Sequence, residues 1–575
     1  MAVMRNAKTP STFSRRVVST WLSVCIAITT LPTAVAGEKK EVLQYHPIQV
    51  DKNGHILPWN TSATSPNLGR AYDQIIESLW VFWRDMRRDA NGLPYYMNHQ
   101  VWQPTVNDRR GLGGDQFNMA LSSWKLLFAY RGGTQGFHQN NEVRDNMQFI
   151  ADYYLAHSLS PATAAWPNFP YPYNSILYSG RYDGDMVIGP GYTQPDKAAS
   201  FGAELVELYK LVQYRSFDAS VYLDAATRIA DTLVTKVKAG DNNHSPWPFK
   251  VHAVSGKPGT IVGAETKTRI DSDYTTNWGG ALDLFSELIR MKRGNVAAYQ
   301  KAFETVLVWM KAYPMKTNKW GPFFEDIERW SDTQINAVTW AQWIMEHREF
   351  FPNWQSDVRH ILDWASENLG NPSWEKYGVI AINEQTAYKV PGNSHTSRQA
   401  AAELRFAELT GDLSRKAMAI RQLNWATYMV DKDGKNKYYH DEVWLTDGYG
   451  DYIRHYLRAM AAAPELAPDN KDRLLRCTGV ATVVQYNADD GRYWEPTRKP
   501  GKDKVVLRYT TFEKSSMEVI RMVEKPARVV AGSGEDLVLS ERPALDAEGW
   551  TWEPIGKGGV LRVRHDTRAN ITVYR

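Results

Sequence analysis

Cysteine, surplus charge and long apolar runs are all scarce in this sequence. Its 575 residues include only 2 cysteines, and 68 basic residues face 64 acidic ones, for a formal net charge of +4. Because basic and acidic residues are nearly equal in number over this length, the charge gives no reason to expect a nucleic-acid partner. After the N-terminal segment no stretch is apolar enough to cross a bilayer, so we expect no membrane span. Nothing in the sequence indicates an oligomeric state.

The N-terminus has the features of an export signal. Basic residues precede an apolar run over 17–31, and Ala34-Val35-Ala36 matches an A-x-A cleavage site. We therefore expect a signal peptide over residues 1–36, with cleavage near Ala36-Gly37. The mature chain would then be exported, to the periplasm or outside the cell.

The cysteine count also limits the chemistry. Removal of the signal peptide takes Cys25 and leaves Cys477 alone, which excludes an intrachain disulfide and a thiolate zinc site. The segment 431–436 has two aspartates at calcium-loop spacing but lacks the third acidic ligand and the closing glutamate, so it predicts a polar turn. No phosphate-binding glycine loop, serine elbow or dinucleotide fingerprint is present. We expect no cofactor and no metal.

Hydrophobic residues make up 43% of the chain, and from about residue 70 to 462 they recur at three- and four-residue steps. This periodicity predicts twelve helices, which fall into six hairpins with short turns inside a pair and long loops between pairs. Six such hairpins indicate a closed (α/α)6 toroid. An open helical-repeat solenoid is the alternative, but the intervals here are irregular. The expected helices cover 70–90, 115–131, 142–158, 199–215, 219–237, 279–293, 296–312, 332–347, 355–369, 398–410, 412–430 and 447–462.

After residue 477 the pattern changes to short strands separated by glycine and proline turns. We expect strands near 480–486, 505–510, 527–530, 536–539, 559–564 and 570–574. The fold is therefore predicted to be mainly α, with a helical toroid over 37–476 and a small antiparallel β-domain over 477–575. The β-domain is expected to have a structural role, and carbohydrate binding is the alternative.

Aromatic residues are abundant: 12% of the chain, including 22 tryptophans. Many fall in loops between the helix pairs that are also rich in Pro, Gly and Asn. Ordered aromatic loops on a rigid scaffold are typical of a binding face, and flat, uncharged sugar rings suit them as partners. Core packing is the alternative. The candidate substrate-binding residues are Trp166, Trp247, Trp320, Trp444, Tyr439 and His440.

The segment 391–399 has the densest set of catalytic residue types. Asn393, His395 and Arg398 lie where a loop is expected to enter a helix, so their side chains could converge. Breaking a uronate glycan by β-elimination requires neutralisation of the carboxylate, a base for the C5 proton and an acid for the leaving oxygen. Asn and Arg suit the first task, and His or Tyr, with Tyr449 as the candidate, suit the proton transfers. The alternative is that Ser394 or Thr396 caps the helix and His395 is simply buried.

Carboxylates near helix starts keep a glycoside hydrolase open as an alternative. In that reaction one carboxyl protonates the leaving oxygen and another activates water. Each could equally be a helix cap. The candidate acids and bases are Asp115, Glu325, Asp326, Asp332 and Asp447.

With its helical hairpins, export signal, C-terminal β-domain and Asn/His/Arg/Tyr set, the chain resembles the toroidal polysaccharide lyases and, more widely, the six-hairpin glycosidase superfamily. The resemblance implies a site formed by Asn393, His395, Arg398 and Tyr449. It also implies a secreted lyase with a polysaccharide or oligosaccharide substrate that contains uronic acid. The alternatives are a hydrolase on the same toroid, a uronyl epimerase, or a non-catalytic secreted protein that binds glycan.

Overall fold

A computed structural model describes residues 45–85, 114–132, 141–171, 184–185, 189–213, 218–262, 269–323, 330–436, 449–486, 504–532 and 536–575. The predicted signal peptide lies outside these residues. Glu41–Arg575 forms one compact unit. In the parts of the chain that the structure describes, none of the helices has both the length and the apolar character needed to span a membrane.

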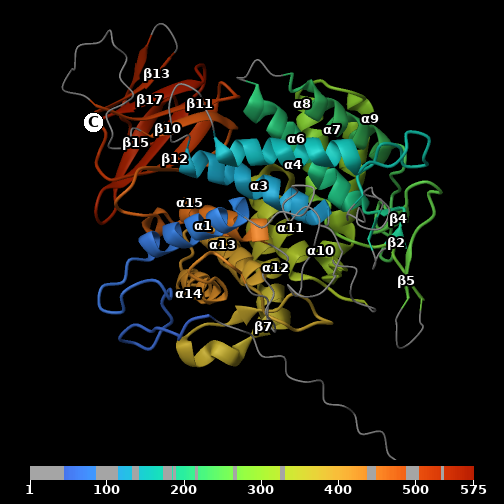
Figure 1. The fold of residues 1–575 in the computed structure, drawn as a ribbon, viewed down its shortest axis with the longest axis horizontal. Coiled ribbons are helices and arrows are strands. Elements are labelled where there is room, and N and C mark those ends of the chain that lie inside the picture. The colour runs from blue at the N-terminus through green and yellow to red at the C-terminus, as the bar shows by residue number, and fades with distance from the viewer. Residues whose placement is uncertain are drawn as a thin grey trace, which may run out of the picture. The chain divides into compact units, whose positions relative to one another are not determined.

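Each of the six predicted hairpins pairs one helix of an inner ring with one helix outside it. Figure 1 labels these helices. The inner helices among the described residues are α3 (Gly114–Arg131), α6 (Pro195–Val212), α8 (Gly279–Arg290), α11 (Gln334–Glu346), α13 (Asn393–Thr410) and α15 (Tyr449–Ala462). Their outer partners are α4 (Glu142–His157), α7 (Ser220–Val234), α9 (Val296–Ala312), α12 (Trp354–Leu369), α14 (Lys416–Ala426) and, for α15, α1 (Leu68–Arg84). A short helix, α10 (Pro314–Thr317), follows α9.

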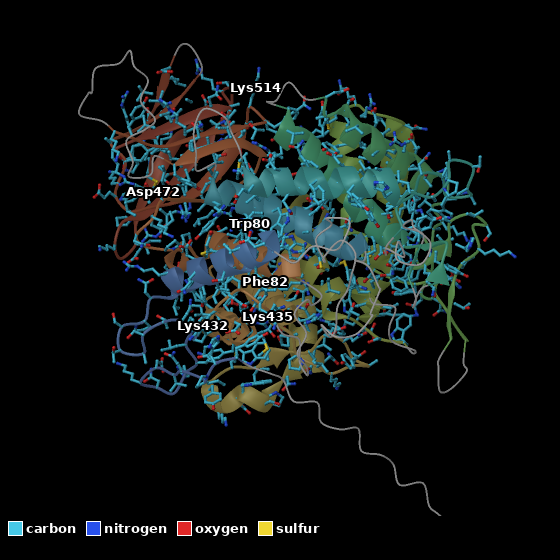
Figure 2. All side chains as sticks on the ribbon, viewed as in Figure 1. Trp80, Phe82, Lys432, Lys435, Asp472 and Lys514 are labelled. Atoms are coloured by element: carbon cyan, nitrogen blue, oxygen red, sulfur yellow. The ribbon has the colours of Figure 1, made fainter. Side chains whose placement is uncertain are left out.

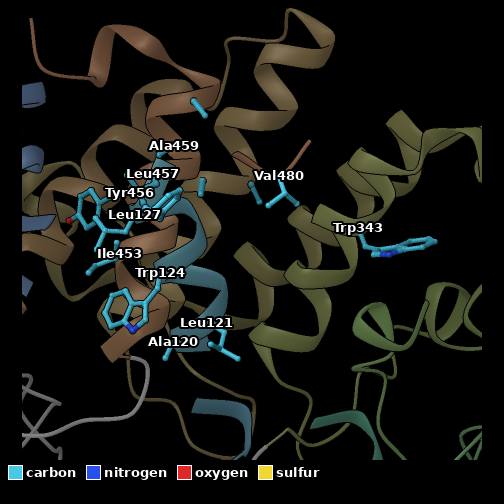
Figure 3. Close-up of a cluster of buried hydrophobic side chains, with 14 of the residues drawn as sticks. Ala120, Leu121, Trp124, Leu127, Trp343, Ile453, Tyr456, Leu457, Ala459 and Val480 are labelled. Atoms are coloured by element: carbon cyan, nitrogen blue, oxygen red, sulfur yellow. The ribbon is translucent and has the colours of Figure 1, made fainter. Parts of the chain in front are cut away.

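The inner helices form a closed ring, because each contacts the next in chain order and α15 returns to α3. At this closing seam Trp124 and Leu127 of α3 lie beside Ile453, Tyr456 and Leu457 of α15, and all five side chains are buried (Figure 3). The (α/α)6 toroid predicted from the sequence is confirmed, and an open solenoid is excluded.

Two helices begin about one turn or more before the predicted residue. Helix α13 begins at Asn393 rather than near 398, and α6 begins at Pro195 rather than near 199. Both extra turns contain buried polar residues, Asp196 and Lys197 in α6 and residues 393–397 in α13, so the apolar periodicity could not reveal them. The polar residues at 393–398 therefore belong to a helix and not to a loop.

The connections that lead into the inner helices contain short antiparallel strand pairs. These are β1 (Gly184–Asp185) with β2 (Gly189–Pro190), β3 (Tyr192–Thr193) with β4 (Val251–His252), β5 (Thr260–Val262) with β6 (Arg269–Asp271), and β7 (Gly370–Asn371) with β8 (Ala381–Ile382). Four 3₁₀ turns accompany the described helices: η1 (Arg348–Phe350), η2 (Pro372–Tyr377), η3 (Thr427–Met429) and η4 (Pro464–Leu466).

The C-terminal region forms two antiparallel sheets. The five-stranded sheet has the order β10-β11-β17-β13-β14, and the four-stranded sheet has the order β15-β16-β12-β9. The strands are β9 (Arg473–Cys477), β10 (Ala481–Tyr486), β11 (Val505–Thr511), β12 (Ser516–Met522), β13 (Arg528–Ala531), β14 (Leu537–Leu539), β15 (Gly549–Pro554), β16 (Gly559–His565) and β17 (Asn570–Tyr574). The sequence did not predict β9, β12 or β15, and β9 begins before the expected boundary at 477.

These sheets contact the ends of the ring where the inner helices terminate. Tyr486 of β10 donates a hydrogen bond to the carbonyl of Ala129 near the end of α3, at 2.9 Å. Arg476 of β9 pairs with Glu408 near the end of α13, at 2.7 Å. Glu513, between β11 and β12, pairs with Lys210 near the end of α6, at 3.2 Å. The β-region therefore lies against the carboxyl-terminal end of the ring, opposite to the end at which the inner helices begin.

Candidate functional site

At the amino-terminal end of the inner ring, polar side chains link one inner helix to the next. We call this set the polar belt. Its links are Asn118 Nδ2 to the Lys197 carbonyl (2.7 Å), Asn277 Nδ2 to Asp196 Oδ2 (2.9 Å), Asn336 Nδ2 to Thr275 Oγ1 (3.4 Å), Arg398 Nη1 to Gln334 Oε1 (2.7 Å) and Arg454 Nη1 to Ser122 Oγ (2.7 Å). Burying so many polar groups is costly unless they are paired, and a core built for stability alone would be apolar here.

Arg398 is the most deeply buried cation of the belt, with 1% of its surface exposed. Its Nη1 donates to Gln334 Oε1, and its Nη2 donates to the hydroxyl of Ser394, one helical turn earlier, at 3.0 Å. Gln334 is fully buried, and its amide Nε2 has no acceptor among the described residues. A buried donor without an acceptor costs free energy, so this end of α11 has hydrogen-bonding capacity to offer a ligand.

A second buried centre lies at the start of α6. Asp196 is fully buried and pairs with Lys197 Nζ at 3.0 Å, while Asn277 donates to the same oxygen. Lys197 Nζ also donates to the Phe323 carbonyl and lies 3.0 Å from the centre of the Phe323 ring. The other carboxylate oxygen of Asp196 has no hydrogen-bond partner in the described part of the chain.

Sequence reasoning missed Asp196. Proline at the first helical position followed by an acid is the ordinary beginning of a helix, so Asp196 looked like a residue that only complements the helix dipole. The available signal was the Asp196-Lys197 doublet directly before a long apolar stretch, because neighbouring opposite charges allow both to be buried as a pair.

The structure does not bring Asn393 and His395 to one face. Because α13 begins at Asn393, residues two positions apart project to nearly opposite sides of the helix. Asn393 donates to Asn436, whereas Arg398, three positions after His395, is directed to α11. His395 and Arg398 therefore share a side of α13, with Asn393 turned away from them. All three are buried.

The capping alternative for this segment is wrong. The N-cap of α13 is Gly392. Ser394 Oγ instead accepts from Arg398, and Thr396 Oγ1 accepts the backbone N–H of Ile382 at 3.0 Å.

Tyr449 is the first residue of α15, and its side chain lies outside the described part of the structure. Tyr452 and His455, which follow Tyr449 in α15, are core residues. Tyr452 is fully buried and donates to the carbonyl of Ala426, and burial raises its pKa well above the ordinary value. His455 is also fully buried.

Asp332 has a structural role. Its Oδ1 accepts the backbone N–H groups of Trp320 and Gly321 at 2.8 and 2.9 Å, and its Oδ2 accepts the indole N–H of Trp330. Asp115 lies in the first turn of α3, with its side chain outside the described part. Glu325, Asp326 and Asp447 lie outside the described residues.

The prediction that loop tryptophans line a sugar-binding cleft is wrong for three of them. Trp166, Trp247 and Trp320 have at most 3% of their surface exposed and belong to the hydrophobic core. Trp247 Nε1 donates to the carbonyl of Leu233 at 2.9 Å, which ties the loop to outer helix α7. They are large apolar side chains that the loops bury against the helices, not a cleft rim. Trp444, Tyr439 and His440 lie outside the described residues.

Farther inside the ring the charges are paired. Although burial favours the neutral carboxyl, Lys125 and Lys210 lower the pKa of Glu207 to about 2. Burial raises the pKa of the neighbouring Glu204. Within the described residues no group of three or more His, Cys, Asp or Glu side chains is arranged to hold a metal ion.

No protein-family model matches the chain, and no curated protein matches it in sequence. The chain is similar to several solved structures at low sequence identity. Cellobiose 2-epimerase from Spirochaeta thermophila DSM 6192 gives a TM-score of 0.49 at 12% identity, over 69% of this chain and 98% of that one. A family 76 glycoside hydrolase from a bovine Bacteroides thetaiotaomicron strain gives 0.45 at 11% identity, over 70% and 79%. A polysaccharide lyase gives 0.38 at 10% identity, over 69% and 97%.

Proposed function

We propose that this chain is an exported enzyme that acts on glycans, and that it cleaves a uronate-containing polysaccharide by β-elimination at the polar belt. The observation that carries the proposal is the pair formed by Arg398 and Gln334. A buried guanidinium, positioned by Gln334 and Ser394, lies beside an amide donor that has no acceptor among the described residues. Such donors suit a carboxylate, which accepts several hydrogen bonds at once.

The proposed step uses residues on one side of α13. Arg398 and Gln334 hold the uronate carboxylate, so that the negative charge that develops when the C5 proton leaves is stabilised. His395 takes that proton. The electron pair forms the C4–C5 double bond, the bond from C4 to the glycosidic oxygen breaks, and an acid protonates the leaving oxygen. Tyr449 remains the proposed acid, and Gln334 replaces Asn393 as the amide that holds the carboxylate.

A panel of alginate, glucuronan, pectate, ulvan and chondroitin sulfate tests the proposal. Elimination creates a conjugated double bond, so ultraviolet absorbance rises together with the number of reducing ends. Reducing ends without absorbance would refute elimination and indicate hydrolysis. The absence of both signals across the panel would refute cleavage of uronate polymers.

Asp196 favours glycoside hydrolysis as the second candidate function. A fully buried carboxylate with one oxygen unpartnered among the described residues is suited to serve as a general acid or base. The substitution Asp196→Asn separates the two candidates. Hydrolysis that depends on Asp196 as acid or base would be abolished, whereas elimination by His395 and Arg398 would keep its double-bond product.

A further inference from the structure

Trp330 differs from the other tryptophans of the described chain because its side chain is exposed. Its accessible fraction is 39%, and no other tryptophan is among the exposed large hydrophobic residues of the described part. An exposed tryptophan on a loop is costly to hold in place, because solvent offers it no packing partners. Trp330 is nevertheless held by a hydrogen bond, a ring contact and a nearby cation.

The hydrogen bond fixes the indole of Trp330 through its ring N–H group. Its Nε1 donates to Asp332 Oδ2 at 3.1 Å. Asp332 is held in turn, since its Oδ1 accepts two backbone N–H groups at 2.8 and 2.9 Å and its own N–H donates to Thr386 Oγ1 at 3.0 Å. The carboxylate that orients the indole is therefore tied to the connections before α11 and α13.

Two further groups lie against the indole ring. Tyr274 is buried, and its ring centre lies 5.2 Å from that of Trp330. Lys319 Nζ lies 4.7 Å from the centres of both rings and donates to the Asn242 carbonyl at 2.7 Å. An aromatic ring that is anchored by a hydrogen bond, a ring contact and a cation loses little freedom when a ligand binds.

The position of this ring connects it with the polar belt. Trp330 lies on the connection that leads into α11, and α11 begins with Gln334, the partner of Arg398. The opposite end of the ring is in contact with the β-region. The exposed indole is thus on the end of the toroid to which we assign the chemistry.

We propose that Trp330 is a sugar-binding platform, on which one pyranose ring of the glycan stacks by its C–H face, outside the position where the bond is cleaved. The ligand class follows from the indole itself, which offers a broad, neutral, rigid face. The assignment rests on the proposed glycan activity, and it adds a subsite that determines how strongly a long chain is held.

Affinity gel electrophoresis on the five polymers of the panel tests the platform without requiring catalysis. Trp330→Ala should weaken retardation by the bound polymer on the order of tenfold, and Trp330→Phe, which keeps an aromatic face, should lose less. Phe149→Ala is the matched control, because Phe149 is similarly exposed (37%) but lies on outer helix α4. It should bind as the wild type does.

Kinetics on the cleaved polymer give an independent readout. A platform outside the cleavage position contributes equally to the ground and transition states, so Trp330→Ala should raise KM and leave kcat nearly unchanged. Wild-type binding that depends on Trp330 without any double-bond product would refute the proposed elimination and leave the platform standing. Equal binding by wild type and Trp330→Ala, or no binding by the wild type to any polymer, would overturn the platform.

Discussion

Burying the guanidinium of Arg398 has a free-energy cost that hydrophobic packing alone would not incur. Two hydrogen bonds offset this cost, one to the side-chain amide oxygen of Gln334 and one to the hydroxyl of Ser394. Both acceptors come from the first turns of inner helices, so the orientation of the guanidinium depends on where two helices begin. As packing alone, this arrangement is unfavourable in free energy. In the proposed function it places hydrogen-bond donors beside the substrate carboxylate.

Arg398→Lys should reduce activity at least about 100-fold, because a lysine ammonium cannot donate in the planar, two-pronged geometry of a guanidinium. The side chain keeps its charge and most of its length but not the geometry of both buried hydrogen bonds, so the thermal transition should fall moderately while the protein stays folded. Arg359→Lys is the control, since Arg359 makes an ion pair with Asp412 at the surface. Rates on the cleaved polymer and circular dichroism melts check both expectations. Full activity of Arg398→Lys would show that Arg398 is structural.

The sequence drew attention to some of the buried polar residues of the inner ring and not to others, for one reason. Arg398 and His395 stood out because they lie in a dense polar segment. Asp196 and Gln334 did not, because each looks like an ordinary helix start, and only the closed ring shows that four such starts meet in its interior. Distances between inner helices are set by packing across the ring, which a single sequence does not encode locally.

Among the elements, the turn 431–436 shows how a small segment holds the first residue of an inner helix, Asn393 of α13. The turn closes through a bridge between Val430 and Asn436, and Asn436 accepts from Asn393 of α13. Lys432 and Lys435 mark this turn in Figure 2. Gly434 occupies a left-handed conformation with φ of 82° and lies against the Ser78 carbonyl of α1. The polar turn predicted from the sequence is confirmed.

Gly434→Ala should therefore destabilise the protein by about 3 kcal/mol, from left-handed strain plus a clash between the new Cβ and the Ser78 carbonyl. Gly411→Ala is a matched control, because Gly411 has φ of 77° but no neighbouring atom within 4 Å of the place that an alanine Cβ would occupy. It should cost only about 1 kcal/mol of strain. Urea denaturation of the two variants measures the difference. Equal losses would contradict the close contact at Gly434.

Helix α13 also contains a carboxyl group that is buried against its outer partners. Burial raises the pKa of Glu403 to about 7, with hydrogen bonding from Gln399 acting in the opposite direction. Arg415 Nη1 lies 2.9 Å away but is shared with Asp363. Because the folded-state pKa is above the ordinary 4.5, Glu403 contributes most stability at low pH, and this contribution is lost as the pH rises through about 7.

Glu403→Gln, which imitates the protonated carboxyl, should lose less stability than the wild type between pH 5 and pH 8. Thermal melts across that interval measure the effect. Glu367→Gln, at an exposed position of α12, is the control and should follow the wild-type profile. A Glu403→Gln profile parallel to that of the wild type would show that Glu403 is ionised in the fold throughout.

Element by element, hydrophobic periodicity predicted all twelve ring helices, because each buries an apolar stripe against its neighbours. It misplaced the starts of α6 and α13, where the buried residues are polar. It also missed β12, in which Glu518 and Arg521 are buried within the sheet and interrupt the apolar alternation expected of a strand. The two misplaced helix starts and the missed strand β12 therefore fall where polar groups are buried through specific pairing.

In the whole molecule, the β-region supports the ring through ion pairs at its carboxyl-terminal end. Lys210 is 3% exposed and contacts Glu207, Glu287 and Glu513, the last of which belongs to the turn between β11 and β12. A buried ammonium that loses a partner is costly. The β-region is accordingly expected to unfold together with the helices, and not as a separate module.

Glu513→Gln should lower the free energy of unfolding by about 1 to 2 kcal/mol, less than for a lone buried pair because two carboxylates remain beside Lys210. The readout is the helical signal in far-ultraviolet circular dichroism during denaturation. Glu553→Gln, in an exposed pair with Arg562, should change it little. An unchanged helical transition in Glu513→Gln would mean that the β-region does not stabilise the ring.

The central claim, elimination at the polar belt, is tested most directly by cleaving the active polymer in water enriched in heavy oxygen and weighing the products by mass spectrometry. Elimination adds no water, so products analysed before their reducing ends exchange the anomeric oxygen with the solvent should be unsaturated and carry no heavy oxygen at the new ends. Saturated products with one heavy oxygen at each cleavage would contradict it and establish hydrolysis.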